Sequence, residues 1–246
     1  MPLFYLRGLT GRHRSERANR HLAWYLAFVA GAANAGGFFA VHHYTSHMSG
    51  VVASMADNTA LGSVRLVMIG AASVLAFFSG SFLTTLFVRW ARERAMHSEY
   101  AFPLFAEALL LVIFGLHGAE MSSGRAVVAL IVLLCFSMGL QNAIITKLSD
   151  AVIRTTHVTG MVTDIGIAVG RIVSGRRGGD IDIARELDTV RLLSALILLF
   201  FLGGVAGAIG FRHIGFRFAL PLAAILMLLA GLPVADDVLR RERAAA

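Results

Sequence analysis

The amino-acid sequence predicts an all-α membrane protein with six transmembrane helices and two half-helix or re-entrant segments, arranged as an inverted three-plus-three repeat. The first observation behind this prediction is composition, because 57% of the 246 residues are hydrophobic, 15% are charged and the mean hydropathy is +0.73. Such a chain is too apolar for a soluble domain and typical of a helical membrane protein. The second observation is a set of six long apolar runs, and the third is a polar, histidine-containing motif that occurs twice.

Each of the six apolar runs is long enough to cross a bilayer as a helix, which takes roughly 17 to 25 residues. The runs cover residues 22–41, 66–88, 100–116, 126–145, 192–211 and 218–234. The first run follows a basic segment, 1–21, but it exceeds the apolar core of a signal peptide, so we expect a retained span. Two further segments, 47–61 and 155–172, look helical but are too polar or too short to be spans.

The distribution of basic residues predicts that both termini lie in the cytoplasm. If the two motif segments enter and leave on one side, 18 of the 22 Lys and Arg residues lie on the cytoplasmic side. If both segments cross fully, that number falls to 15, with Arg89, Arg92 and Arg94 outside. Cytoplasmic loops of membrane proteins are enriched in Lys and Arg, which favours the first topology. The basic N-terminus and the tail at 235–246 are then expected to contact anionic lipids, not nucleic acid.

The halves 22–116 and 126–234 repeat the same order of elements: span, motif segment, span, span. Each half has a Gly-x-x-Asn-Ala sequence at the end of its first span, at 31–35 and 139–143. The motif follows a dozen or so residues later, as Thr45-Ser46-His47-Met48-Ser49-Gly50 and as Thr155-Thr156-His157-Val158-Thr159-Gly160. An odd number of spans in each half inserts the second copy upside down, so we expect the two motifs to enter from opposite faces.

A polar stretch at 174–191 has no counterpart in the first half. Its glycines and charges predict a cytoplasmic loop with a short amphipathic helix.

The motifs resemble those of the YoaK-like family of bacterial inner-membrane proteins. The resemblance rests on the two Gly-x-x-Asn-Ala sequences, on the first motif, and on the longer sequence Arg-Thr-Thr-His-Val-Thr-Gly-Met-Val-Thr-Asp at 154–164. It extends from about residue 23 to residue 234, and it implies a multispanning protein of the bacterial inner membrane with no particular chemistry. The chain departs from the family pattern at Asn34, where an Asp is usual, and at Val51, where an Asn is usual. Both departures fall in the first half of the predicted site.

The two motifs are predicted to form one composite substrate site that faces the protein interior. On a helix, His157, Gly160 and Asp164 share one face, and the first copy repeats this pattern. Ser and Thr are preferred helix caps, so we expect the hydroxyl residues before each histidine, Thr45 and Ser46 or Thr155 and Thr156, to cap the motif helices. Helix N-termini attract anionic or carbonyl-bearing groups. The residues assigned to substrate binding or coupling in the motifs are His47, Ser49, Gly50, His157, Thr159, Gly160 and Asp164. Histidines in such motifs also tie helices together without binding a ligand, and that interpretation stays open.

Four further polar residues lie within or at the ends of predicted spans. Asn34, Asn142 and Gln141 can either satisfy backbone carbonyls at a helix break or contact the substrate. Glu107 lies in the middle of the third span, where an ionisable group costs at least a few kcal/mol unless it faces the protein interior or water. It is either a proton-coupling group or a neutral acid that is hydrogen-bonded to a neighbour.

The predicted function is secondary transport or export of a small solute, with one half of the molecule moving against the other. Two alternatives stay open: a passive channel with a polar constriction, and an intramembrane metal-handling protein or enzyme that uses His47, His157 and Glu107. His42 and His43 are further potential metal ligands. The sequence has no phosphate-binding glycine loop or nucleotide fingerprint, so we expect no enzymatic activity and no cofactor. The expected partners are the bilayer and an unidentified solute or ion, with a homo-oligomer left open.

Overall fold

The computed structural model describes residues 15–41, 44–94, 96, 99–121, 126–148, 156–175 and 182–245, which form helices and turns with no strand among them. The helices are α2 (Glu16–Val41), α3 (Met48–Ala60), α4 (Val64–Glu93), α5 (Ala101–Met121), α6 (Ala126–Leu148), α7 (Val158–Gly175), α8 (Ile183–Ile214), the 3₁₀ turn η1 (Gly215–Phe218) and α9 (Ala219–Ala245). The predicted all-α class is confirmed for the described part of the chain.

Four helical stretches among the described residues are long and apolar enough to cross a membrane: Val64–Glu93, Ala101–Met121, Ala126–Lys147 and Ile183–Gly231. The last of these contains α8, η1 and the first part of α9. The chain turns between α8 and α9 at Gly215, whose φ of 69° is one that glycine adopts without strain. This pattern is that of an integral, multi-pass membrane protein.

Helix α4 has small residues inside and large apolar residues outside. Its buried positions include Gly70, Ser73, Ala76, Gly80 and Thr84. Its exposed side chains include Leu75, Phe78, Phe82 and Leu86. An apolar face of this size is unfavourable in water, whereas small residues between membrane helices let two backbones approach closely. The side-chain distribution therefore fits a helix that faces lipid.

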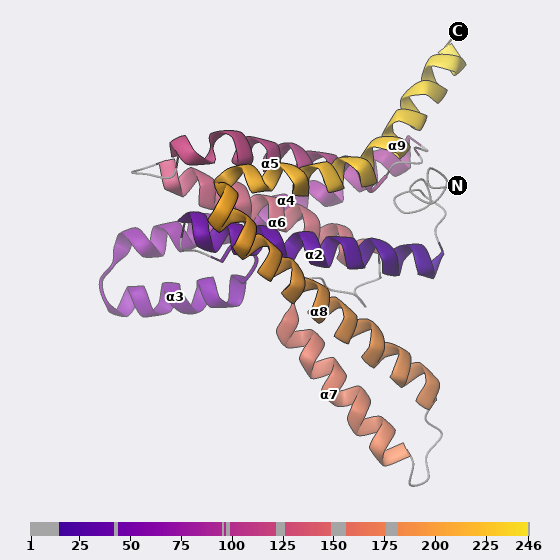
Figure 1. Ribbon diagram of the computed structural model, residues 1–246, viewed down its shortest axis with the longest axis horizontal. Coiled ribbons are helices and arrows are strands. Elements are labelled where there is room, and N and C mark those ends of the chain that lie inside the picture. The colour runs from indigo at the N-terminus through magenta and orange to yellow at the C-terminus, as the bar shows by residue number, and fades with distance from the viewer. Residues whose placement is uncertain are drawn as a thin grey trace.

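The helices pack in matching pairs, some between the two halves of the chain and some within each half. Helix α2 lies along α8, and α4 lies along α6; these are the two most extensive helix contacts in the molecule. Helix α3 folds back onto α4 and α7 folds back onto α8, so that each half contributes a helical hairpin (Figure 1). The last helix of each half completes the arrangement, because α5 packs against α9.

Glycines allow the two long helix pairs to cross at backbone contact. A Cβ atom at Gly31 of α2 would lie 2.0 Å from the carbonyl oxygen of Phe200 in α8. A Cβ atom at Gly139 of α6 would lie 2.1 Å from the carbonyl oxygen of Phe77 in α4. Real Cβ atoms do not approach a carbonyl oxygen this closely, so only glycine fits at either position. The glycine of each Gly-x-x-Asn-Ala sequence thus has a packing role.

The two motif helices run in opposite directions from the middle of the molecule. In Figure 1, α3 and α7 both begin near the centre, and α3 runs outward to one end while α7 runs outward to the other. The start of α2 and the end of α9 lie at the same end of the bundle. The N-terminal ends of the motif helices are therefore brought together, although they are about a hundred residues apart in the sequence.

Residues 183–191 form the first turns of α8, so this part of 174–191, where we expected a loop with a short amphipathic helix, is continuous with the next long helix. Asp182 caps this helix, because its side chain accepts a hydrogen bond from the backbone amide of Arg185 at 3.2 Å. Asp188 forms an ion pair with Arg20 of α2, and Glu186 forms another, at 3.2 Å, with Arg171 of α7. The cap and the two ion pairs stabilise this polar extension of α8. It contains no apolar run from which a helix could be predicted.

Candidate functional site

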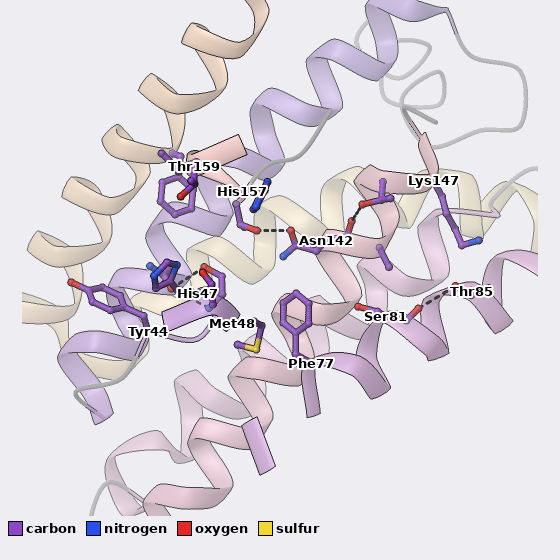
Figure 2. A pocket seen from close by; sticks show the side chains of 18 residues that line it. Tyr44, His47, Met48, Phe77, Ser81, Thr85, Asn142, Lys147, His157 and Thr159 are labelled. Carbon is purple, nitrogen blue, oxygen red and sulfur yellow. Dashed lines mark hydrogen bonds between the residues drawn. The ribbon is translucent and has the colours of Figure 1, made fainter. Parts of the chain in front are cut away.

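A cavity of about 900 Å³ lies where the two motif helices begin, between α4 and α6 (Figure 2). Both motifs contribute to it, as do both Gly-x-x-Asn-Ala sequences through their asparagines. The lining residues are Asn34, Tyr44, Ser46, His47, Met48, Ser49, Phe77, Ser81, Thr85, Asn142, Ala143, Thr146, Lys147, Thr156, His157, Val158, Thr159 and Phe200. In Figure 2, His47 and His157 lie toward one end of the cavity, and Lys147 and Thr85 lie toward the other.

Each motif histidine lies over the first turn of its helix. His47 is the N-cap residue of α3, but its side chain makes no capping hydrogen bond. A Cβ atom at Gly50 would lie 2.2 Å from Cδ2 of His47, and one at Gly160 would lie 2.2 Å from Nδ1 of His157. The glycine three residues after each histidine therefore leaves room for the imidazole ring, and this explains the spacing within the motif.

Asn34 holds the segment that leads into the first motif helix. Its Oδ1 accepts hydrogen bonds from the backbone amides of Thr45, at 3.2 Å, and Ser46, at 3.3 Å. The Ser46 hydroxyl donates a third hydrogen bond to the same oxygen at 3.0 Å. The expectation that Thr45 or Ser46 caps α3 is therefore wrong, because the cap residue is His47 and Ser46 is bonded to Asn34.

Asn142 occupies the matching place in the second half. Its Oδ1 accepts a hydrogen bond from the hydroxyl of Thr156, which precedes the second motif histidine. Its Nδ2 donates to the carbonyl oxygen of Met138 at 2.8 Å. Each motif is thus tied to the first helix of its own half by an asparagine, and both asparagines also border the cavity.

The eleven residues predicted from the sequence fall into three groups. Six line the cavity: Asn34, His47, Ser49, Asn142, His157 and Thr159. Gly50 and Gly160 lie beneath the histidine rings instead of facing the cavity. Gln141, Glu107 and Asp164 are not among the lining residues. Asp164 is exposed on α7, so the polar stripe predicted along that helix reaches the cavity only through its first turn.

Glu107 and Gln141 are buried polar residues outside the cavity lining. Both side chains are 0% exposed, as is that of Ser137, one turn before Gln141 on α6. Their side-chain oxygens, and the Gln141 Nε2, have no hydrogen-bond partner among the described residues. Glu107 lies 14 residues before the end of α5 and Gln141 lies 15 residues after the start of α6, which packs against α5. At about 1.5 Å of rise per residue, the two side chains lie at nearly the same depth.

Lys147 is one of the lining residues that sequence reasoning missed. The charge distribution assigns it only to the cytoplasmic side, yet it lies five residues after Asn142, on the same helix. A signal was present in the composition, because Lys147 is the single lysine in the chain, beside 21 arginines. Ser81 and Thr85 were missed for a different reason: they belong to a long span whose polar positions do not recur in the second half.

The structure places no metal site in the residues it describes. Nowhere in that part of the chain do three His, Cys, Asp or Glu side chains come together as potential ligands. His42 and His43, the further potential metal ligands beside His47, lie outside the described residues.

Comparison with known proteins places the chain in a family. A search of curated proteins and a search of solved structures each found no match. A family model described as "Protein of unknown function (DUF1275)" matches residues 22–232, which include both motifs and every described residue of the cavity. The chain therefore belongs to the DUF1275 family.

Proposed function

We propose that the protein is a secondary transporter or exporter of a small solute, and that the solute binds in the cavity between the two motif helices. One observation carries the proposal: helix N-termini from different halves of the chain meet at a single cavity that contains both motif histidines. Interrupted helices that meet near the middle of a bundle are the usual substrate site of inverted-repeat transporters. The proposal therefore rests on architecture and on the residues at the site.

The helix packing supports the inverted repeat on which this mechanism depends. An inverted repeat makes α2, α3, α4 and α5 of the first half equivalent to α6, α7, α8 and α9 of the second. The contact of α2 with α8 is then equivalent to the contact of α6 with α4. The contact of α3 with α4 likewise corresponds to that of α7 with α8, and both pairs of contacts are present. Six spans with α3 and α7 as re-entrant segments agree with this packing. With the N-terminus and the C-terminus in the cytoplasm, this topology also follows the distribution of basic residues. By resemblance, we assign the protein to the bacterial inner membrane.

Glu107 is the proposed coupling group. Its carboxyl group is buried and has no hydrogen-bond partner among the described residues. Gln141 lies at the same depth on α6, and the next residue, Asn142, is bonded to the second motif. Because α5 packs against α6, a change in the protonation of Glu107 would alter the surroundings of the helix that carries Asn142. Ile225 occupies the corresponding position of α9, so only one half carries this group.

The proposal is tested first by a growth screen and then by flux. A deletion strain is challenged with toxic ions, weak acids and amines, and any phenotype is complemented with the wild-type protein and with His157→Ala. The purified protein in vesicles should then give saturable flux of the identified solute that follows a proton or sodium gradient. His157→Ala should lose at least tenfold in flux, whereas His213→Ala, which changes an exposed histidine on α8, should not.

Two outcomes would contradict this function. Flux that never saturates and never concentrates the solute would indicate a channel. Flux in Glu107→Gln vesicles with an unchanged dependence on pH would remove Glu107 from coupling. A Glu107→Gln protein that still binds the solute but no longer concentrates it is the expected result.

A further inference from the structure

The charge of the cavity lining indicates what kind of solute it accepts. We infer that the cavity binds a small organic anion, of the carboxylate class. The inference deepens the proposed transport function and rests on it for the movement of the solute, but its own claim concerns binding. Of the described residues that line the cavity, one is a lysine, two are histidines and none is Asp or Glu.

Lys147 provides the full positive charge. It is partly buried at the cavity wall, and none of the described residues forms an ion pair with it. An ammonium group at the wall of a cavity attracts negatively charged groups, because a cleft lined by one sign of charge concentrates the opposite sign. Since the described lining supplies no such group, a bound anion is the natural counter-ion.

The two motif helices add partial positive charge at the opposite end of the cavity. Helix α3 begins at Met48 and α7 begins at Val158, and both residues line the cavity. The His47 side chain makes no capping hydrogen bond, so no side chain of the cap residue occupies the first-turn amides of α3. Unpaired amides and the helix dipole together favour an anion at such an end.

The carboxylates of the motif helices and of the core lie elsewhere. Asp57 and Asp164 are exposed on α3 and α7, beyond the first turn, and Glu107 is buried in the core. None of these three residues belongs to the lining. The described wall of the cavity therefore attracts an anion from both ends, and it contains no carboxylate that would hold a cation in place.

The size of the cavity and its apolar contacts favour an organic anion over an inorganic one. A volume of about 900 Å³ far exceeds that of a halide, and Phe77 and Phe200 border it. The hydroxyl of Ser81 donates to the carbonyl oxygen of Gly139 at 3.0 Å, and that of Thr85 donates to the carbonyl oxygen of Ser81 at 3.2 Å. These hydroxyl oxygens remain available to accept hydrogen bonds from donor groups on the body of the ligand.

Ligand binding to the purified full-length protein tests the inference. The protein is kept in uncharged detergent with phosphatidylcholine, so that no anionic lipid headgroup competes, and its thermal unfolding is followed at constant ionic strength. The probes are succinate, gluconate and benzoate as carboxylates, sulfate and chloride as inorganic anions, choline as a cation, and sorbitol as a neutral solute. At least one carboxylate should raise the unfolding temperature in a saturable manner, because a ligand that binds the folded state stabilises it.

Variants of Lys147 identify the binding group. Lys147→Gln should need at least tenfold more carboxylate for the same shift, whereas Lys147→Arg, which keeps the charge, should stay within a fewfold of the wild type. Arg65→Gln removes an equal charge from an exposed position on α4 and should change nothing. If Lys147 serves only to stabilise the C-terminal end of α6, Lys147→Gln will lower the unfolding temperature without ligand and leave the shift intact.

The results separate this inference from the proposed function. Binding of choline or sorbitol without any carboxylate, binding of sulfate or chloride alone, or no binding at all would overturn the inference. An unaltered shift in Lys147→Gln would also overturn it. Carboxylate binding without flux in vesicles would leave the inference standing and remove the transport function. Flux of a cation or a neutral solute without carboxylate binding would overturn the inference and leave the transport function standing.

Discussion

Asn34 and Asn142 hold the two motifs from equivalent positions, but they use their side-chain amides differently. Asn34 forms three hydrogen bonds with described residues, and its Oδ1 accepts all three. Asn142 uses both ends of its amide, because Oδ1 accepts from Thr156 and Nδ2 donates to the carbonyl oxygen of Met138. A residue that only accepts hydrogen bonds can therefore replace Asn34 but not Asn142. An Asp at the first position, which the family resemblance implies to be usual, would keep these three acceptor contacts.

We predict that Asn34→Asp keeps the stability of the protein and that Asn142→Asp lowers it. An ionised Asp at position 34 still accepts from the Thr45 and Ser46 amides, and hydrogen bonds to charged groups are the stronger ones. An Asp at position 142 loses its donor and places negative charge against the Met138 carbonyl oxygen. Asn142→Asp should lower the free energy of unfolding by about 1–3 kcal/mol. Denaturation of the two variants in detergent checks this, and equal destabilisation would contradict the assignment.

Two close crossings, of α2 with α8 and of α4 with α6, determine how the helices pack. Each has a glycine on both helices: Gly31 and Gly203 at the first crossing, and Gly139 and Gly80 at the second. A Cβ atom at any of these positions would lie 2.0 to 2.1 Å from a carbonyl oxygen of the facing helix. The obstacle is backbone, which cannot rotate away as a side chain can. These crossings set the distance between the helices that carry the two asparagines and the helices that form the hairpins.

We predict that Gly139→Ala strongly destabilises the protein, whereas Gly166→Ala does not. The added methyl group at position 139 must push α6 away from α4, at a cost of at least about 2 kcal/mol. Gly166 is the matched control, because it is also in a helix and a Cβ atom added there would meet no described atom within 4 Å. Replacing it with Ala should leave stability unchanged or raise it by up to about 1 kcal/mol. Unfolding temperatures and the yield of monodisperse protein measure the difference, and a tolerated Gly139→Ala would refute the close crossing.

For the whole molecule, the decisive feature is the meeting of the two motifs at one cavity. The motif helices run outward to opposite ends of the bundle from a shared centre (Figure 1). Because one motif belongs to each half, a movement of one half against the other changes the shape of the cavity. Glu107 on α5 is a buried acid, whereas Ile225 occupies the corresponding position in the second half. The two halves are therefore similar in packing but unequal in chemistry.

We predict that cysteines at Ser49 and Thr159 can be bridged by a short bismaleimide, because both residues line the same cavity. Cys135, the single cysteine, is first replaced by Ala, and a protease site is placed between residues 122 and 125 to separate the halves. After cleavage the two fragments should remain joined in a denaturing gel. A pair at Ser54 and Thr159 is the control, because Ser54 is exposed on α3 and away from the cavity. Fragments that separate in the 49–159 pair would show that the motifs do not meet.

The helices could be predicted from the sequence because each is marked by a local pattern. Apolar runs predict the long helices, and the repeated motif marks the start of α3 and of α7. The joining of the polar segment 183–191 to the apolar part of α8 was not predicted. The Asp182 cap stabilises this segment from within, and its ion pairs with Arg20 and Arg171 depend on two other helices. Lys147 looks like a topological charge in the sequence, since nothing in its neighbours shows that its side chain borders a cavity.

The sequence by itself determined the all-helical class, the membrane location and the two copies of the motif, because hydrophobicity and repetition are properties of neighbouring residues. Only the tertiary structure decided that both motifs line one cavity, that Lys147 joins them, and that Gly50 and Gly160 lie under histidine rings. It also placed Glu107 in the buried core instead of in the cavity wall. These facts depend on how helices a hundred residues apart cross, and no local pattern reveals which residues of the facing helix the glycines of each crossing contact.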